Sequence, residues 1–136
     1  MDDVRIGEQG RTCLVVDDSS VVRKIARRIL EEFNFQIIEA ENGERALEAC
    51  RRAMPTAVLL DWNMPVMDGH EFLLHLRRLP GGEAPKVVFC TTENNIDHIS
   101  RALEAGADEY IMKPFGKDII AAKFHEVGLI AAPMPA

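Results

Sequence analysis

Short apolar runs alternate along this chain with longer amphipathic segments. The runs are only a few residues long and are mostly unbroken by polar residues, which is typical of strands that are covered on both faces of a sheet. The predicted strands are Cys13–Val16, Gln36–Ile38, Ala57–Leu60, Lys86–Cys90 and Glu109–Met112. The pattern therefore predicts a sheet that lies between other layers.

The segments between these runs repeat their apolar residues at helical spacing. In the first of them, Val22, Ile25 and Ile29 fall on one stripe of a helix. Glycines close the last two segments, at Gly106 and Gly128. The predicted helices are Ser20–Phe33, Gly43–Arg52, Gly69–Leu79, Ile96–Ala105 and Phe115–Val127.

This repeated alternation of strand and helix predicts an α/β fold. Parallel strands need right-handed helical crossovers, and these place helices on both faces of the sheet. We expect a five-stranded, doubly wound parallel sheet with the flavodoxin-like order 2-1-3-4-5. A chain of 136 residues favours one domain, which we assign to residues 11–128, with an N-terminal extension at 1–10 and a C-terminal tail at 129–136.

Composition narrows the class of protein. Apolar residues make up 47% and charged residues 28% of the chain, which is typical of globular domains. The net charge of −6 argues against a nucleic-acid-binding protein, which is usually basic. Residues 1–10 lack the apolar core of a signal peptide, and no apolar run approaches the about 20 residues that span a bilayer. We therefore expect a cytoplasmic protein without membrane insertion.

The cysteines and histidines do not show the spacing of a metal site. Cys13, Cys50 and Cys90 are odd in number, and two of them lie in apolar runs. We interpret them as buried, reduced thiols, with a redox switch as the alternative. The histidines, which we interpret as helix-surface residues, are His70, His75, His98 and His125.

Polar side chains follow four of the predicted strands, at the point where each strand ends. In an open α/β sheet, ligands bind beyond the carboxyl ends of the strands, next to the point where the strand order reverses. Each of these residues alone has a plain structural explanation, such as a helix cap or a surface charge, but together they indicate a site. They are Asp17 and Asp18, Asp61, Thr91 and Thr92, and Lys113.

This set of side chains is suited to phosphoryl transfer. Neighbouring carboxylates repel one another, so the three aspartates favour a bound cation, and Mg²⁺ prefers oxygen ligands while keeping positions for water and phosphate. A carboxylate such as Asp61 can act as a nucleophile and form an aspartyl phosphate. The Thr91 hydroxyl and the Lys113 ammonium can neutralise the phosphoryl oxygens. The chain has no glycine-rich phosphate loop, so ATP is not the expected direct donor.

At these positions the chain resembles the response-regulator receivers of two-component signalling. The motifs that carry the resemblance are Asp17-Asp18-Ser19, Asp61-Trp62-Asn63-Met64-Pro65 with Asp68-Gly69, Thr91, and Lys113-Pro114-Phe115. The resemblance covers roughly residues 11–128 and is strongest to single-domain, CheY-like members. It implies a phosphoprotein that assists its own phosphorylation and dephosphorylation but is otherwise not an enzyme.

The resemblance also implies how the acceptor and the metal are held. Asp61 would be the phospho-acceptor. Asp17, Asp18 and Asp61 would hold Mg²⁺ with their side chains, and Asn63 would add its backbone carbonyl. The donor of the phosphoryl group would be a histidine kinase or a histidine phosphotransferase.

Further residues would transmit the signal or set how long the phosphoryl group persists. Thr91 and Lys113 would bind phosphoryl oxygens, and the Lys113–Pro114 peptide bond is expected to be cis. Tyr110 would be the switch aromatic, which makes the fourth helix, fifth strand and fifth helix the readout face. Asn63 and Glu93 would tune the rate at which the phosphoryl group is hydrolysed.

Several outputs are compatible with such a receiver. The first is control of chemotaxis or motility through a partner such as a flagellar motor switch. The second is regulation of histidine kinases, or a place in a phosphorelay, in development or stress signalling. The third is binding of a cyclic dinucleotide, for which arginines such as Arg23 and Arg27 offer planar forks. A haloacid-dehalogenase-like phosphatase is disfavoured, because its second carboxylate would stand where this chain has Asn63.

Overall fold

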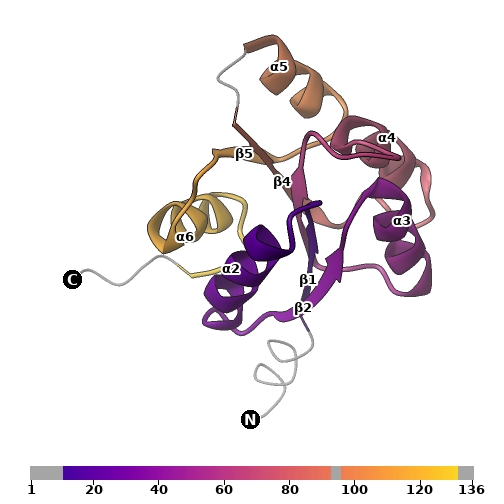
Figure 1. Cartoon of the computed structure of the whole chain (residues 1–136). Coiled ribbons are helices and arrows are strands. Elements are labelled where there is room, and N and C mark those ends of the chain that lie inside the picture. Colours follow the sequence, from indigo (N-terminus) through magenta and orange to yellow (C-terminus); the bar gives the residue numbers. More distant parts are fainter. Residues whose placement is uncertain (1–10, 93–95, 132–136) are drawn as a thin grey trace.

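Five parallel strands form one sheet in the order β2-β1-β3-β4-β5, which confirms the fold predicted from the sequence (Figure 1). The computed structural model describes residues 11–92 and 96–131. The strands are β1 (Thr12–Val16), β2 (Gln36–Ala40), β3 (Ala57–Asp61), β4 (Lys86–Thr91) and β5 (Glu109–Met112). The helices are α2 (Ser20–Glu31), α3 (Gly43–Arg52), α4 (Gly69–Arg78), α5 (Ile96–Glu104) and α6 (Lys117–Glu126).

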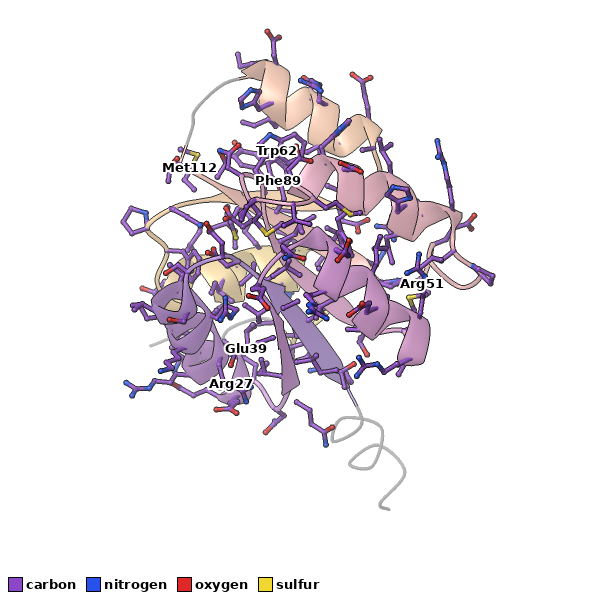
Figure 2. All side chains as sticks on the ribbon, turned by 45° about the vertical axis from the view of Figure 1, so that its right-hand side comes forward. Arg27, Glu39, Arg51, Trp62, Phe89 and Met112 are labelled. Carbon is purple, nitrogen blue, oxygen red and sulfur yellow. The ribbon has the colours of Figure 1, made fainter. Side chains whose placement is uncertain are left out.

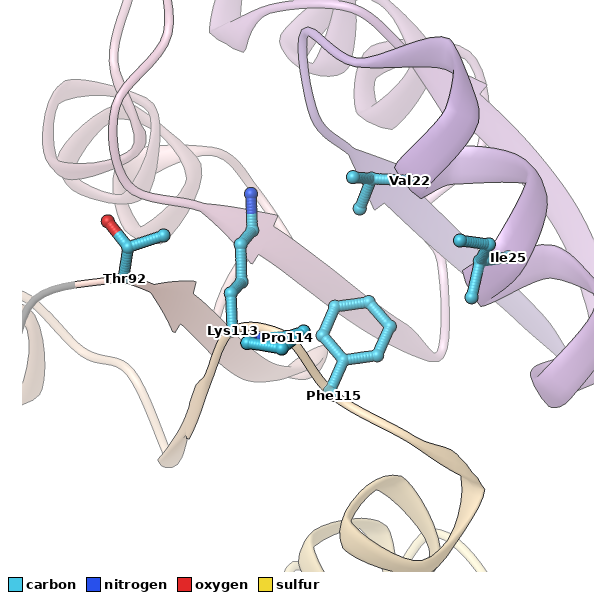
Figure 3. A pocket seen from close by; sticks show the side chains of 6 residues that line it. All are labelled: Val22, Ile25, Thr92, Lys113, Pro114 and Phe115. Carbon is cyan, nitrogen blue, oxygen red and sulfur yellow. The ribbon is translucent and has the colours of Figure 1, made fainter.

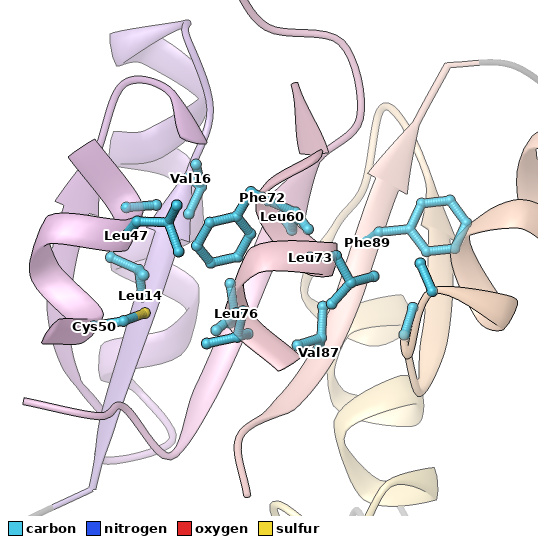
Figure 4. Close-up of a cluster of buried hydrophobic side chains, with 14 of the residues drawn as sticks. Leu14, Val16, Leu47, Cys50, Leu60, Phe72, Leu73, Leu76, Val87 and Phe89 are labelled. Atoms are coloured by element: carbon cyan, nitrogen blue, oxygen red, sulfur yellow. The ribbon is translucent and has the colours of Figure 1, made fainter. Parts of the chain in front are cut away.

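Helices cover both faces of the sheet and bury two apolar layers. In Figure 1, α2 and α6 lie on one side, and α3, α4 and α5 lie on the other. Successive residues of β1 point to opposite layers, so Cys13 and Val15 pack with α2 and α6, whereas Leu14 and Val16 pack with α3 and α4. Figure 4 shows the second layer, with Phe72 of α4 packed against the sheet.

The central strands are buried more fully than the edge strands. Every residue of β3 is buried, but β2 pairs only with β1 among the described residues and leaves Ile38 37% exposed. The expected burial on both faces is therefore wrong for β2. The helix α5 is also loosely covered, with Ala102 as its only buried residue in the described part of the chain. Asp17, Asp61 and Thr91 lie at the ends of the central strands β1, β3 and β4, whereas Lys113 follows the edge strand β5.

The first helix ends earlier than predicted, and its closing turn explains why. The helix α2 stops at Glu31, and Asn34 adopts a positive φ of 69°. The N–H of Phe35 then donates to the carbonyl of Leu30 at 3.3 Å, a bond that closes the end of the helix. Phe33 therefore lies in the turn, where it packs against the α2–α6 layer.

The last helix also differs from its predicted span. It begins at Lys117, so Phe115 lies in the preceding loop. Beyond its end, Gly128 has a positive φ of 84°, and the N–H of Leu129 donates to the Phe124 carbonyl at 2.8 Å. Leu129 is buried, and its carbonyl accepts a hydrogen bond from Arg11. Ile130 also packs against the α2–α6 layer, so packing extends two residues into the segment that the sequence assigns to the tail.

The cysteines are all buried, as expected. Burial raises the pKa of Cys13 to about 12 and that of Cys50 to about 11, and it also raises the pKa of Cys90. A thiol with a raised pKa is a poor nucleophile at neutral pH. Over residues 11–92 and 96–131, no helix is both long and apolar enough to cross a bilayer.

Candidate functional site

Three aspartates meet at the carboxyl ends of two neighbouring strands. Asp17 and Asp18 follow β1, and Asp61 is the last residue of β3, which pairs with β1. One carboxylate oxygen from each aspartate lies within 4.8 Å of the other two. Asp17 and Asp61 are buried, whereas Asp18 is exposed. The sequence correctly predicted that these side chains come together.

Lys113 connects the two buried carboxylates. It follows β5, and its Nζ lies 2.7 Å from Asp17 Oδ2 and 3.0 Å from Asp61 Oδ1. Its backbone N–H donates to the carbonyl of Thr91 at 2.8 Å, so the end of β4 helps to hold the loop that carries it. The Lys113–Pro114 peptide bond is cis, as the resemblance implied.

The cluster is electrostatically unbalanced. Burial, together with the nearby Asp17 and Asp18 charges, raises the pKa of Asp61 from 3.8 to about 6, although Lys113 opposes the shift. Burial lowers the pKa of Lys113, but its hydrogen bonds to Asp17 and Asp61 outweigh this effect and hold the pKa above its usual value. The cluster holds two more carboxylates than ammonium groups.

These residues fit a divalent cation. All the donor atoms are carboxylate oxygens, which are the ligands that Mg²⁺ prefers. A double positive charge would balance the excess of carboxylates and would lower the pKa of Asp61. The exposed Asp18 leaves the cluster open to solvent on one side, where an ion can enter and retain water ligands.

A local turn fixes Asp17 before the first helix begins. Its Oδ1 accepts a hydrogen bond from the backbone N–H of Ser19 at 2.9 Å, and Ser19 in turn caps α2 by accepting from Val22 N–H at 3.2 Å. Arg23, one turn into the helix, donates to the backbone carbonyl of Asp17. This contact of Arg23 was not predicted from the sequence, because it depends on the fold of the turn.

A glycine allows the chain to return close to the end of β3. The N–H of Gly69 donates to the Trp62 carbonyl at 3.0 Å. A Cβ at Gly69 would lie only 2.4 Å from the Asp61 carbonyl oxygen, so a larger residue would displace the backbone next to the site. Asp68 caps α4 through Glu71 N–H at 2.9 Å. The motif containing Asp68 and Gly69 thus supports Asp61 without touching its carboxylate.

Aromatic rings lead from the site toward the expected switch residue. Trp62 follows Asp61, and its ring centroid lies 5.5 Å from that of Phe89 (Figure 2). The Phe89 ring lies 5.9 Å from that of Tyr110, which is half-buried on β5. Thr91, at the end of β4, is buried. Packed side chains therefore join the end of β3 to β5, the strand that carries Tyr110.

Other predicted residues lie around the cluster. Asn63 and Thr92 are exposed, and Glu93 lies outside the described residues. His70 and His98 are half-buried rather than on the surface, with ring centroids 5.4 Å and 6.2 Å from that of Trp62. Their expected position on the helix surface is wrong, because α4 and α5 both pack against Trp62.

Two of the arginines considered for nucleotide binding are already engaged. Arg23 and Arg27 each donate to Glu39 on β2, at 2.9 Å and 2.8 Å, and Figure 2 shows Arg27 beside Glu39. Glu39 therefore engages the Nε atom of each guanidinium group. The α2 face carries less free positive charge than its sequence suggests.

An apolar pocket opens beside the cluster. Its volume is about 310 Å³, and Figure 3 shows the side chains that line it. It is lined by Val22 and Ile25 of α2, by Thr92, and by Lys113, Pro114 and Phe115.

Comparison with known proteins identifies relatives of the chain. The family model described as the response regulator receiver domain matches residues 13–125. Chemotaxis protein CheY of Halobacterium salinarum is 37% identical over 115 residues, which cover 84% of this chain and 93% of that protein. The phosphate regulon transcriptional regulatory protein PhoB of Escherichia coli is 35% identical over 124 residues, which cover 91% of this chain and 54% of PhoB. The chain thus spans about half the length of that relative.

Solved structures resemble the fold closely. Chemotaxis protein CheY4 of Vibrio cholerae matches with a TM-score of 0.82 and 26% identity, over 86% of this chain and 98% of that protein. A CheY-like receiver domain protein from Methanospirillum hungatei matches with a TM-score of 0.78 and 27% identity, over 86% of this chain and 92% of that one.

Proposed function

The chain belongs to the response regulator receiver family, and from this premise we propose that it is a phosphorylation-controlled signalling module whose acceptor is Asp61. The observation that carries the proposal is the contact of Lys113 Nζ with the Asp17 and Asp61 carboxylates, at 2.7 Å and 3.0 Å. A buried carboxylate next to an ammonium and two further carboxylates has the parts that phosphoryl transfer to aspartate requires.

In the transfer step, an oxygen of Asp61 attacks the phosphorus of the donor. A new phosphorus–oxygen bond forms, and the bond from phosphorus to the donor's leaving atom breaks. Asp61 must be ionised to attack, and a pKa of about 6 leaves most of it ionised at neutral pH. Lys113 already lies against Asp61 and would bind one phosphoryl oxygen, while the Thr91 hydroxyl would bind another.

Mg²⁺ is the cofactor that we assign to the aspartate cluster. Asp17, Asp18 and Asp61 would hold the ion with their carboxylates, and Asn63 would add its backbone carbonyl. When bound, the ion supplies positive charge that offsets the charge of the phosphoryl oxygens. Asn63 and Glu93 would also influence how quickly water removes the phosphoryl group. The protein would then catalyse only its own phosphorylation and dephosphorylation.

Incubation of the protein with acetyl phosphate and Mg²⁺ tests this function. Phosphate-affinity electrophoresis should show a phosphorylated band for the wild type, a much weaker one when the Mg²⁺ is chelated, and none for Asp61→Asn. Equal phosphorylation of wild type and Asp61→Asn would exclude Asp61 as the acceptor.

Phosphorylation would change which partner the protein binds. We propose that Thr91 moves toward the phosphoryl group and Tyr110 turns inward, which alters the surface of α5, β5 and α6. The named CheY relatives favour a partner in chemotaxis or motility, such as a flagellar motor switch, with a histidine kinase or phosphotransferase as the donor. Regulation of histidine kinases in another pathway is the second candidate, because the PhoB relative belongs to a different signalling system.

Affinity capture distinguishes these two roles. The bait is the protein with Mg²⁺ and beryllofluoride, a mimic of phosphorylated Asp61, and the control bait is Asp61→Asn. Capture of a motor component by the activated bait alone supports the motility role. Capture of kinases or phosphotransferases supports the second role. Identical partners on both baits would contradict a switch at Asp61.

A further inference from the structure

Apart from Lys113, the residues that line the apolar pocket beside the cluster have no role in the phosphoryl transfer proposed above. Val22 and Ile25 of α2 form one wall, and the ring of Phe115 lies between them and the Lys113–Pro114 segment (Figure 3). Its volume of about 310 Å³ is at the small end of the range for ligand sites in proteins. Ile25 remains 47% exposed although it is apolar, so this lining stays accessible to solvent.

The pocket and the phospho-acceptor share one residue. The side chain of Lys113 lines the pocket, while its Nζ lies 3.0 Å from Asp61 Oδ1. A molecule whose phosphate binds at Lys113 could therefore place a neighbouring apolar group in this pocket, between the Phe115 ring and the wall formed by Val22 and Ile25. This arrangement suits a small ligand with an anionic end and an apolar end.

We propose that the pocket receives the acyl group of small acyl phosphates, so that Asp61 accepts phosphoryl groups faster from acyl phosphates with longer apolar chains. The inference rests on the proposed function of Asp61. In the reaction, the Asp61 oxygen bonds to phosphorus, the bond between phosphorus and the acyl oxygen breaks, and the fatty-acid carboxylate leaves with the bonding electron pair. No proton, oxidant or further reactant is needed.

Butyryl phosphate and acetyl phosphate give the sharpest comparison. Their carboxylate leaving groups have similar basicity, so their intrinsic reactivity is similar. Butyryl phosphate has two additional methylene groups, and burial of both in the pocket corresponds to a roughly tenfold higher rate at low donor concentration. The ratio of the two rates therefore measures the acyl contact and cancels effects common to both donors.

The test measures initial phosphorylation rates of Asp61 by both donors for the wild type and two variants. Ile25→Ser removes an apolar wall of the pocket. Ile119→Ser is the matched control, because Ile119 is also a helical isoleucine, is 38% exposed and does not line this pocket. We expect a butyryl-to-acetyl ratio of roughly ten for the wild type and for Ile119→Ser, and a ratio near one for Ile25→Ser.

Each contrary result has a distinct meaning. A butyryl-to-acetyl rate ratio near one in the wild type would overturn the inference. The pocket would then be a candidate site for a side chain of a donor protein instead. A tenfold ratio that persists in Ile25→Ser would also overturn it, because the preference would not come from this pocket. Failure of both donors to phosphorylate the wild type, or phosphorylation of Asp61→Asn, would instead overturn the proposed function on which the inference rests.

Discussion

Charged side chains gather at opposite ends of the sheet in two clusters that are built in opposite ways. At the amino ends of β4 and β5, the guanidinium of Arg77 donates to the carbonyls of Gly82, Pro85 and Gly106 and to the carboxylate of Asp108. The same Asp108 oxygen accepts from the backbone N–H at the second residue of β4 at 2.8 Å. This cluster pairs one cation with one anion and satisfies both.

The cluster at the carboxyl ends of the strands is left unbalanced. One ammonium, that of Lys113, serves two buried carboxylates, and Asp18 adds a third carboxylate nearby. The raised pKa of Asp61 means that ionisation of its carboxyl group is less favourable in this cluster than in water. The difference teaches that the Arg77 cluster stabilises the fold, whereas the aspartate cluster gives up stability, as expected of a site that we propose binds a cation and a phosphoryl group.

The largest expected effect is a loss of stability when Arg77 is removed from its cluster with Asp108. Arg77→Ala leaves several partly buried carbonyls and the Asp108 carboxylate without their donor, so we expect a loss of about 3 kcal/mol in the free energy of unfolding. Urea unfolding followed by circular dichroism measures this loss. Arg78→Ala is the control, because Arg78 is exposed, and it should cost less than about 0.5 kcal/mol. Equal losses in the two variants would contradict the structural role of Arg77.

The next-largest expected effect is a gain in stability. Asp61→Asn removes a carboxylate whose charge is disfavoured in the folded state, so we expect the metal-free variant to be more stable than wild type at pH 7.5 by about 2 kcal/mol. The same linkage makes the wild type lose stability as pH rises from 3.8, the usual pKa of aspartate, to about 6. Urea unfolding across this pH range should show that the loss is absent in the variant. A variant less stable than wild type at pH 7.5 would contradict this account.

A smaller effect follows from adding the cation. Mg²⁺ at about ten times its dissociation constant should stabilise the folded protein by about 1.4 kcal/mol, because it binds the folded state alone. Thermal unfolding with and without MgCl₂, at constant ionic strength, measures the shift. Asp18→Asn should remove most of it, whereas Glu104→Gln, an equal change of charge on exposed α5, should retain it. Equal shifts in both variants would indicate screening by salt rather than a site.

The smallest expected effect comes from backbone strain in the loop that follows β3. Val66 lies in the loop after β3 with a positive φ of 70°, which is unfavourable for a β-branched residue, and its side chain is 73% exposed. Val66→Gly should release this strain and stabilise the protein by about 0.5 kcal/mol after the entropy cost of glycine. Val66→Ala keeps the Cβ and should gain less. Chemical denaturation of both variants decides the point, and a destabilised Val66→Gly would refute it.

Most of the fold could be predicted from the sequence, because the patterns that indicate strands and helices are local. Apolar runs, helical spacing and the rule for parallel crossovers predict the strand order without knowledge of any tertiary contact. The same order brings Asp17, Asp61 and Lys113 to one end of the sheet, so the site was predictable once the fold was known. The convergence of these three residues agreed with the structure, whereas the expected burial of β2 did not.

The remaining features depend on contacts between distant segments. Nothing near Arg77 in the sequence indicates that it binds the carbonyl of Gly106, since residues at helix ends commonly serve the helix dipole. The closing turn at Asn34 and the packing of His98 on Trp62 likewise require the positions of neighbouring elements. Tertiary packing, rather than local preference, decided these details.

The most direct test of the central claim locates the phosphoryl group chemically. The protein is phosphorylated with acetyl phosphate and Mg²⁺, reduced with borohydride, which converts an aspartyl phosphate to homoserine, and sequenced by mass spectrometry. The account predicts homoserine at position 61 and at no other aspartate. Homoserine at Asp17 or Asp18, or at no position in a protein that has taken up phosphate, would contradict it.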